Sequence, residues 1–235
     1  MVPFKHLPNP LTPQTKSFPR VLLPGTPSLQ PLWIRLRRLS IQPTPHLLLV
    51  EIPRQRLLWL KLEKTLSSPI PSRLYRVQAI WPVSTSRYGI GQRLHSRKTP
   101  LGLHRIASIH GRGWPCGIVL QARRPTGYTW QQRPDAPILH RALWLEGLEP
   151  GWNQGGEVDS YTRMIYLHGT SQESKLGRPA SIGCIHLASQ PILTLADALP
   201  PGTLVWITSQ KISLSPPNLE SPASPQRFSL AKATK

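Results

Sequence analysis

Short apolar segments separated by turn residues run through the middle of this 235-residue chain, and they constrain its fold more than any other feature. The segments are rich in β-branched and aromatic residues and are too short for a row of regular helices. They lie at residues 46–52, 55–62, 75–83, 117–121, 138–144, 164–167 and 204–208. Many short strands joined by turns predict a mainly β fold, either a β-sandwich or an open barrel.

One segment indicates a helix. Residues 192–199 follow Ser189, which can cap a helix, and Pro191, which suits a first helical turn. The run Pro200-Pro201-Gly202 ends the pattern. We therefore expect one or two short helices beside the strands.

Proline-rich sequence flanks the strand-rich region on both sides. Residues 1–45 contain much Pro, Thr, Ser and Leu without a sustained period, which predicts a disordered extension that adds little to the core. Prolines recur in residues 209–235 and predict a flexible basic tail. The sequence thus predicts one folded domain, at residues 46–208, between two tails.

The charge is strongly unbalanced. The chain has 29 Lys and Arg residues against 10 Asp and Glu residues, a formal net charge of +19. Such a balance favours an anionic partner, which could be nucleic acid, a phospholipid surface or an acidic cell-wall polymer. Nucleic acid is disfavoured, because the sequence has no zinc-finger spacing, no RNA-recognition strand signature and no basic helix.

The chemistry concentrates between Tyr166 and Leu187. His168 stands at a strand end, followed by Gly169, and Cys184 follows Gly183 in the run Ser181-Ile182-Gly183-Cys184-Ile185-His186-Leu187. A thiol after glycine is presented on a tight turn, where backbone amides can face a reacting carbonyl. A histidine base and a thiol nucleophile together predict acyl transfer through a thioester.

The ordered motifs of the whole region resemble those of the L,D-transpeptidase catalytic domain, or YkuD domain, over about residues 46–208. The matching positions are Val50 through Leu58, Pro82-Val83-Ser84-Thr85-Ser86, Tyr88-Gly89, Gly91, Ser96, Lys98-Thr99-Pro100-Leu101-Gly102, Arg141, Leu143-Trp144-Leu145, Gly147-Leu148-Glu149-Pro150-Gly151, Asn153, Val158-Asp159, Arg163, Ile165-Tyr166-Leu167-His168-Gly169-Thr170 and Pro179 through Leu187. The last block carries the Ser-x-Gly-Cys signature.

The resemblance implies an enzyme that cleaves the bond before D-alanine in a peptidoglycan stem tetrapeptide and transfers the acyl group to an amine. In that interpretation Cys184 is the nucleophile, His168 is the base, and the Gly169 carbonyl fixes the imidazole tautomer. The backbone N–H groups of Gly183 and Cys184 would form the oxyanion hole. No cofactor is implied.

Two further residues are candidates for substrate binding. Ser181 either orders the nucleophile loop or meets the substrate. His186 stands where the family usually has Arg or Asn, and it is either a substrate contact or a local hydrogen-bonding group. As a substrate contact with an ordinary pKa near 6.5, it would make substrate capture depend on pH. Ile182 replaces the histidine that many members carry there.

Other residues invite simpler interpretations. We expect Cys116 to be an inert buried thiol, because no base lies at a comparable spacing. Asp159 and Arg163 are expected to form a supporting ion pair below the active-site strand. His104 and His110 lack the partners of a standard metal site, so no metal is predicted.

Alternatives remain at the level of function and location. Water as acceptor would make the enzyme an L,D-carboxypeptidase, and a catalytically weak, basic cell-wall or nucleic-acid binding module is the rival from another class. No signal peptide or membrane span is predicted, since the apolar runs near the N-terminus are interrupted by Pro24 and Arg35. The family resemblance nevertheless favours the periplasm or cell envelope, with the cytoplasm as the alternative.

Overall fold

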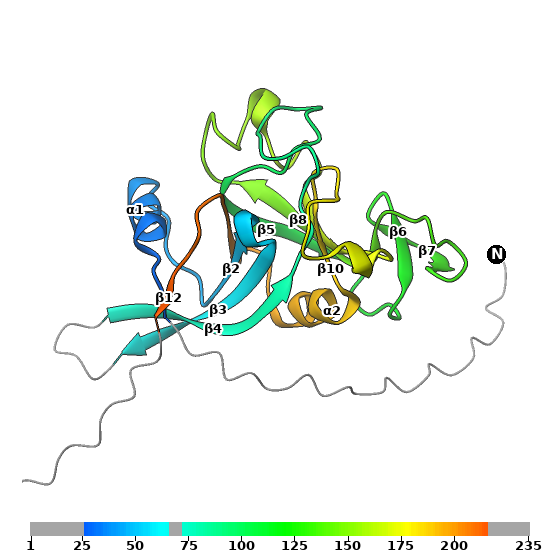
Figure 1. Cartoon of the computed structure of the whole chain (residues 1–235), viewed down its shortest axis with the longest axis horizontal. Coiled ribbons are helices and arrows are strands. Elements are labelled where there is room, and N and C mark those ends of the chain that lie inside the picture. The colour runs from blue at the N-terminus through cyan, green and yellow to red at the C-terminus, as the bar shows by residue number, and fades with distance from the viewer. Residues whose placement is uncertain (1–25, 66–71, 216–235) are drawn as a thin grey trace, which may run out of the picture.

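A ten-stranded, mostly antiparallel sheet forms the body of the protein, as a computed structural model shows for residues 26–65 and 72–215 (Figure 1). Its strands are β2 (His46–Glu51), β3 (Arg56–Thr65), β4 (Ser72–Pro82), β5 (Gly102–His110), β6 (Ile118–Gln121), β7 (Arg124–Thr129), β8 (Leu139–Gly147), β9 (Tyr166–Gly169), β10 (Ile185–Leu187) and β11 (Leu204–Thr208). Short 3-10 helices occupy Ile52–Arg54, Gly156–Val158 and Glu173–Lys175. The prediction of a mainly β fold is confirmed.

The order of strands across the sheet is β10-β9-β8-β5-β11-β2-β3-β4, and the β6–β7 hairpin joins it through β8. The pairs β9–β10 and β2–β11 are parallel. The sheet is open rather than closed. Isolated bridges Ser84–His186 and Ser86–Ser181 nevertheless connect the segment after β4 to the region of β10, at the other end of the strand order.

Strands β2 and β11 lie in the middle of the sheet and are buried on both faces, which explains their continuous apolar sequence. Because side chains alternate along a strand, each strand serves two cores. Leu48 and Val205 belong to one core, which also contains residues of helix α2 (Ser189–Ala198). Leu47 and Trp206 belong to a second core on the other face.

Helix α2 agrees with the expected helix but is capped differently. Ala188, not Ser189, is the residue before the helix, and it makes no side-chain cap. Instead the Glu173 carboxylate accepts a hydrogen bond from the Ser189 N–H at 2.7 Å. An anionic group at a helix N-terminus satisfies a free donor and complements the helix dipole.

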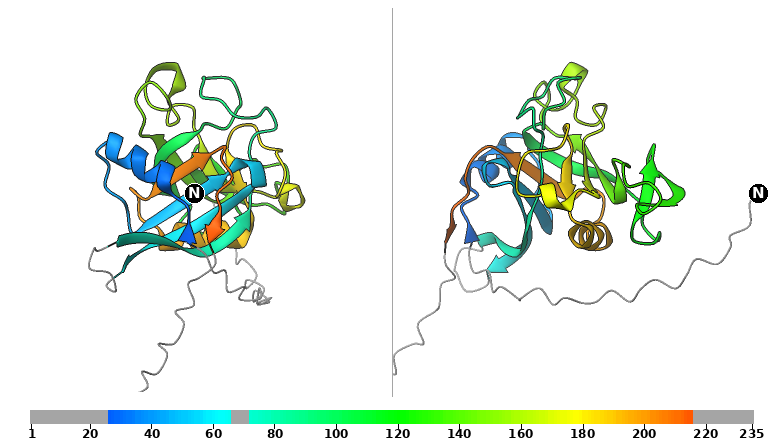
Figure 2. Two further views of the ribbon diagram at one scale, coloured as in Figure 1. Left: turned by 60° about the vertical axis from the view of Figure 1, so that its left-hand side comes forward. Right: turned by 45° about the vertical axis from the view of Figure 1, so that its right-hand side comes forward.

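The prediction that residues 1–45 are a disordered extension is wrong for residues 26–45. They contain helix α1 (Gln30–Arg38), which covers the second core on the side of the molecule opposite to the β6–β7 hairpin (Figures 1 and 2). Leu29, Leu32 and Leu36 are buried there at helical spacing. That short stripe is hidden in the sequence because prolines interrupt the pattern over the longer window.

The predicted C-terminal tail also begins later than expected. Strand β12 (Leu214–Ser215) pairs with β1 (Thr26–Pro27), and Ile212 is buried in the second core. The rest of the two predicted tails, residues 1–25 and 216–235, lies outside the described residues. Neither helix in the described part of the chain is both long and apolar enough to cross a membrane.

Candidate active site

The parallel pair β9–β10 brings together the two residues that the motifs single out. His186 pairs in register with His168, and Ile185 pairs with Leu167. Cys184 directly precedes β10, and since residues two apart share a strand face, we expect its side chain on the face that carries His168 and His186. The half-buried Cys184 thiol donates to the Met164 carbonyl at 3.5 Å.

Ser181 orders the turn that presents Cys184. Its hydroxyl donates to the Cys184 carbonyl at 2.6 Å and accepts from the Gly183 N–H at 3.2 Å. The Gly183 carbonyl in turn accepts from the Thr99 hydroxyl at 2.9 Å. Ser181 is almost fully buried, so both contacts are sheltered from water.

Gly183 therefore differs from its expected role as an oxyanion-hole donor, because its N–H is already bonded to Ser181. Its φ of +138° is a conformation that side chains disfavour, which explains why glycine stands there. Of the two predicted oxyanion donors, the Cys184 N–H is the one that we retain. Gly183 shapes the turn around it.

His168 is buried and fixed in one tautomer. Its Nδ1 lies 2.9 Å from the Gly169 carbonyl oxygen, which can only accept, so Nδ1 carries the proton. Nε2 is then left as an acceptor. Burial lowers the pKa of His168 to about 4, so the ring is neutral at pH 7.

The Cys184 thiol is also neutral at rest. Burial raises its pKa to about 11, while a backbone hydrogen bond at Tyr166 and the charge of Arg163 act in the opposite direction. Thiol and imidazole therefore form an uncharged pair at neutral pH. Any nucleophilic attack by the sulfur requires a proton transfer during the reaction.

Arg163 does not pair with Asp159 as the sequence suggested. Its guanidinium donates to the carbonyls of Gln92 at 2.7 Å and Lys98 at 2.6 Å, with weaker contacts to the Gly91 carbonyl and the Ser96 hydroxyl. No carboxylate within residues 26–65 and 72–215 forms an ion pair with it. Arg163 thus clamps the 91–98 loop and keeps a positive charge near Cys184.

Asp159 instead caps a local turn. Its carboxylate accepts hydrogen bonds from the backbone N–H groups of Gly155 and Thr162, each at 2.8 Å. These bonds to the charged form lower the pKa of Asp159 against the opposing effect of burial. A short carboxylate that bonds nearby backbone donors is typical of Asx turns.

His186 faces the other histidine. The two rings have centroids 4.6 Å apart, and the His186 backbone exchanges hydrogen bonds with Ser84 at 2.9 and 3.1 Å. Burial lowers the pKa of His186 to about 3, with smaller contributions in the same direction from the neighbouring His168 and Lys175. A pKa this low favours a ring that is neutral from pH 5 to 8, in contrast to the expected titration near pH 6.5.

The interpretation of Cys116 as a buried thiol without a base is wrong. Cys116 is exposed, and its sulfur lies 3.4 Å from Nδ1 of His140. The β8 strand bulges between Leu139 and Ala142, where His140 adopts a φ of +64° and packs its ring against Gly169. A bulge changes the facing of side chains, so sequence spacing does not predict this contact.

An aromatic wall beside Cys184 was also missed. Cys184 packs against a buried cluster that includes Trp144 and Tyr166. The Trp144 ring stacks on Tyr161, with centroids 3.8 Å apart and planes 7° apart, and the Arg123 guanidinium lies 4.4 Å from the Trp144 ring centroid. These residues come from four separate segments, and only the period-2 spacing of Ala142 and Trp144 hinted at a shared face.

The two histidines considered as metal ligands are used within the protein. His104 is fully buried between the Gly102 carbonyl and the Ser160 hydroxyl, and His110 contacts the Ser108 hydroxyl at 2.9 Å. Among the described residues, no three His, Cys, Asp or Glu side chains cluster in a way that could hold a metal ion.

A family model matches the strand-rich part of the chain. The sequence model of the L,D-transpeptidase catalytic domain, YkuD, matches residues 45–207. That match covers well over half of the chain, so the chain belongs to the L,D-transpeptidase catalytic domain family.

Two curated relatives are similar over shorter stretches. A probable L,D-transpeptidase YcfS of Escherichia coli strain K12 is 32% identical over 109 residues, covering 46% of this chain and 28% of the relative. A putative L,D-transpeptidase YkuD of Bacillus licheniformis is 38% identical over 61 residues, covering 24% of this chain and 37% of the relative. The match thus spans less than two fifths of either relative.

Solved structures of L,D-transpeptidases are more distant in sequence. One from Mycobacterium smegmatis aligns with a TM-score of 0.42 at 15% identity, over 70% of this chain and 58% of its own. LdtMt1 in complex with imipenem aligns with a TM-score of 0.41 at 18% identity, over 70% and 59%.

Proposed function

We propose that the protein is a cysteine L,D-transpeptidase that acts on peptidoglycan stem tetrapeptides, releases D-alanine and passes the acyl group to an amine. Membership of the family supports the reaction class. The observation that carries the proposal is the pairing of β9 with β10, which sets His168, with its tautomer fixed by Gly169, beside the segment of Cys184.

In the acylation step, Nε2 of His168 takes the proton of the Cys184 thiol as the sulfur attacks the carbonyl before D-alanine. The C–N bond then breaks, the proton passes from His168 to the leaving amine, and a thioester remains. In the second step Nε2 takes a proton from the incoming amine, which attacks the thioester and restores the thiol. The neutral resting pair suits this sequence, because His168 starts as an acceptor.

A nearby positive charge would stabilise the thiolate, and a backbone N–H group would stabilise the negative charge that forms on the substrate oxygen. Arg163 favours the thiolate that forms in the transition state, since its guanidinium lacks a carboxylate partner among the described residues. The Cys184 N–H is the proposed oxyanion donor. Ser181 keeps the turn in place through its two buried contacts rather than by touching substrate.

We propose that His186, next to His168, offers a neutral ring that can form a hydrogen bond to the substrate. Its neighbour in the ladder is the base itself, at 4.6 Å between ring centroids. Because burial keeps its pKa low, it can donate or accept a hydrogen bond to the donor peptide but supplies no charge. The family's usual Arg at this position would supply one.

The acceptor and the location belong to the proposal as well. Water in place of the amine would yield an L,D-carboxypeptidase from the same thioester. The net charge of +19 suits work close to anionic cell-wall polymers, so we place the protein in the periplasm or cell envelope.

The test uses purified full-length protein with a stem tetrapeptide, with and without a candidate amine, and mass spectrometry of the products. We expect release of D-alanine and a product heavier by the amine, and neither with Cys184→Ala. Hydrolysed tripeptide alone would identify the carboxypeptidase. A folded protein that forms no product, and no covalent adduct with a carbapenem such as imipenem, would refute the enzyme in favour of the basic binding module.

A further inference from the structure

The turn of the β6–β7 hairpin is built from residues that such turns normally avoid. Ala122 has a φ of +47° and Arg123 a φ of +69°, both in the left-handed region. Two-residue hairpin turns of this kind usually contain Asn-Gly or Asp-Gly, because other side chains are strained there. Strain that a structure retains often accompanies a functional constraint. The side chain held in place by this turn is that of Arg123.

Arg123 reaches from the hairpin to the aromatic wall beside Cys184. Its guanidinium lies 4.4 Å from the Trp144 ring centroid. It also acts on Tyr166, where it lowers the pKa of the hydroxyl against the larger opposing effect of burial. Trp144, Tyr166 and Cys184 pack together in one cluster. The hairpin, distant from α1 in Figure 1, therefore directs a positive charge to the neighbourhood of the nucleophile.

The charge of Arg123 is not neutralised by the protein. The ion pairs of the described chain use other arginines, and none includes Arg123. Its neighbours are two aromatic rings and His110, whose pKa is lowered by burial and by this same arginine. A half-buried guanidinium without a carboxylate keeps donors available for an anionic group.

A guanidinium fork fits one ligand chemistry especially well. Its parallel N–H groups match the two oxygens of a carboxylate, whereas a carboxamide offers one oxygen and no charge. The cation–π contact with Trp144 anchors the hairpin and still leaves the guanidinium N–H groups able to bind an anion.

We propose that Arg123 binds a side-chain carboxylate of the acyl donor and so selects donors with a free acid over their carboxamides. This inference rests on the proposed transpeptidase function, since it assumes that the donor peptide is bound at Cys184. Arg123 is then a specificity-determining residue, positioned by the strained turn and by Trp144.

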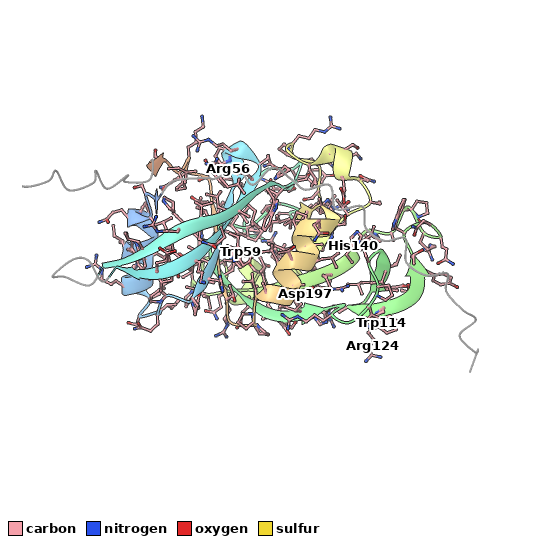
Figure 3. All side chains as sticks on the ribbon, turned by 90° about the horizontal axis from the view of Figure 1, so that it is seen from below. Arg56, Trp59, Trp114, Arg124, His140 and Asp197 are labelled. Atoms are coloured by element: carbon pink, nitrogen blue, oxygen red, sulfur yellow. The ribbon has the colours of Figure 1, made fainter. Side chains whose placement is uncertain are left out.

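The experiment compares two donor peptides that differ only in a carboxylate or carboxamide on the residue before D-alanine. The full chain, Arg123→Gln and Arg123→Lys are assayed for kcat/KM of D-alanine release. Arg124→Gln is the matched control, because Arg124 is exposed and its side chain extends away from the protein (Figure 3).

We expect Arg123→Gln to lose about 10-fold to 100-fold in kcat/KM for the acid donor, mainly through KM, since this is the range for a lost charged hydrogen bond. Turnover of the carboxamide should hardly change. Arg123→Lys should keep part of the preference, and Arg124→Gln all of it. Equal losses with both donors would reduce Arg123 to a hairpin anchor, and unchanged preference would refute the inference.

Binding to Cys184→Ala, measured by calorimetry with the same two peptides, separates this inference from the reaction. A preference for the acid that disappears when Arg123→Gln is added supports the site even if no turnover is found. Turnover by the full chain without such a preference would keep the proposed function and overturn the Arg123 site. Absence of binding by both peptides would overturn it as well.

Discussion

The molecule contains two cysteine–histidine regions on neighbouring strands, and they differ in the state of the imidazole. His168 uses Nδ1 to donate to the Gly169 carbonyl, which leaves Nε2 free to accept a proton. At the second region, Nδ1 of His140 already accepts the Gly117 N–H at 2.8 Å, and the Cys116 sulfur lies against that same nitrogen. A short thiol–imidazole distance therefore does not by itself identify a nucleophile.

The neighbouring charges differ as well. Arg163 acts on Cys184 in the direction that lowers its pKa. Removal of its sulfur from water raises the pKa of Cys116, and the smaller effects of Arg141 and Glu173 oppose each other. Cys184 also follows a glycine turn, whereas Cys116 follows Trp114-Pro115 in an exposed loop. The two thiols therefore differ in the turn that presents them and in the charges around them, rather than in whether a histidine is nearby.

The largest effect should come from removing one thiol or the other. Cys184→Ala should lower D-alanine release by several powers of ten, as expected for a covalent nucleophile, whereas Cys116→Ala should leave it nearly unchanged. Intact mass after carbapenem treatment should show an adduct in Cys116→Ala only. An adduct on Cys116 in the wild type would reverse the comparison.

Removing the charge next to Cys184 should have a smaller effect. Arg163→Ala frees the 91–98 loop and removes the positive charge, so we expect kcat/KM to fall by about 10-fold to 100-fold. The pH profile of Cys184 alkylation by iodoacetamide should move to higher pH, because the thiolate loses its stabilising partner. Arg163→Lys should restore most of that shift. If the profile did not move, Arg163 would act through the loop alone.

The second histidine, like the first, should contribute to the loss of stability in acid. Burial lowers the pKa of His140 to about 4, against an ordinary value of 6.5. The unfolded chain therefore binds a proton that the folded chain does not, and stability falls as the pH drops from 6.5 toward 4. The loss is up to about 1.4 kcal/mol per pH unit for one such histidine.

His140→Asn removes this proton, and Asn tolerates the positive φ at that position. Urea unfolding at several pH values should show a shallower acid-side loss of stability than in the wild type. Cys184 alkylation at pH 7 should stay the same. If the free energy of unfolding changed with pH equally in both proteins, His140 would take up its proton in the folded state at its ordinary pKa.

The smallest effect on the two thiols should come from the far side of the molecule. Leu32 is fully buried in the second core, so Leu32→Ala should lower the free energy of unfolding by about 2–5 kcal/mol. Below the unfolding transition, alkylation of Cys116 and Cys184 should be unchanged. Ile34→Ala, at an exposed position on the same helix, is the control for helix α1.

Much of the site was predictable because it is encoded locally. The strand before His168, the glycine before Cys184 and the helix after His186 each have a short sequence signature, and parallel pairing then joins them. Ser181 was expected to order the loop or to meet substrate, and its two bonds favour the first. These contacts span few residues, so pattern and turn chemistry suffice.

The parts that were missed depend on distant partners. Strand β5 was not predicted, because buried His104 interrupts its apolar pattern and is satisfied by Ser160 from another segment. Helix α1 depends on the second core, and Arg163 depends on carbonyls of a loop far along the chain. Tertiary hydrogen bonds of this kind leave no periodic trace in the sequence.

The contact of Ser84 with the region of Cys184 has a consequence for how the protein folds. The Ser84 hydroxyl accepts from the Ala180 N–H, 96 positions away, and the Ser84 backbone bridges to His186. Closing so long a loop is slow and comes after local structure has formed. The turn that presents the Cys184 thiol beside the strand of His168 is thus expected to form late. Before it forms, in a nascent or partly unfolded chain, Cys184 should react like any exposed cysteine.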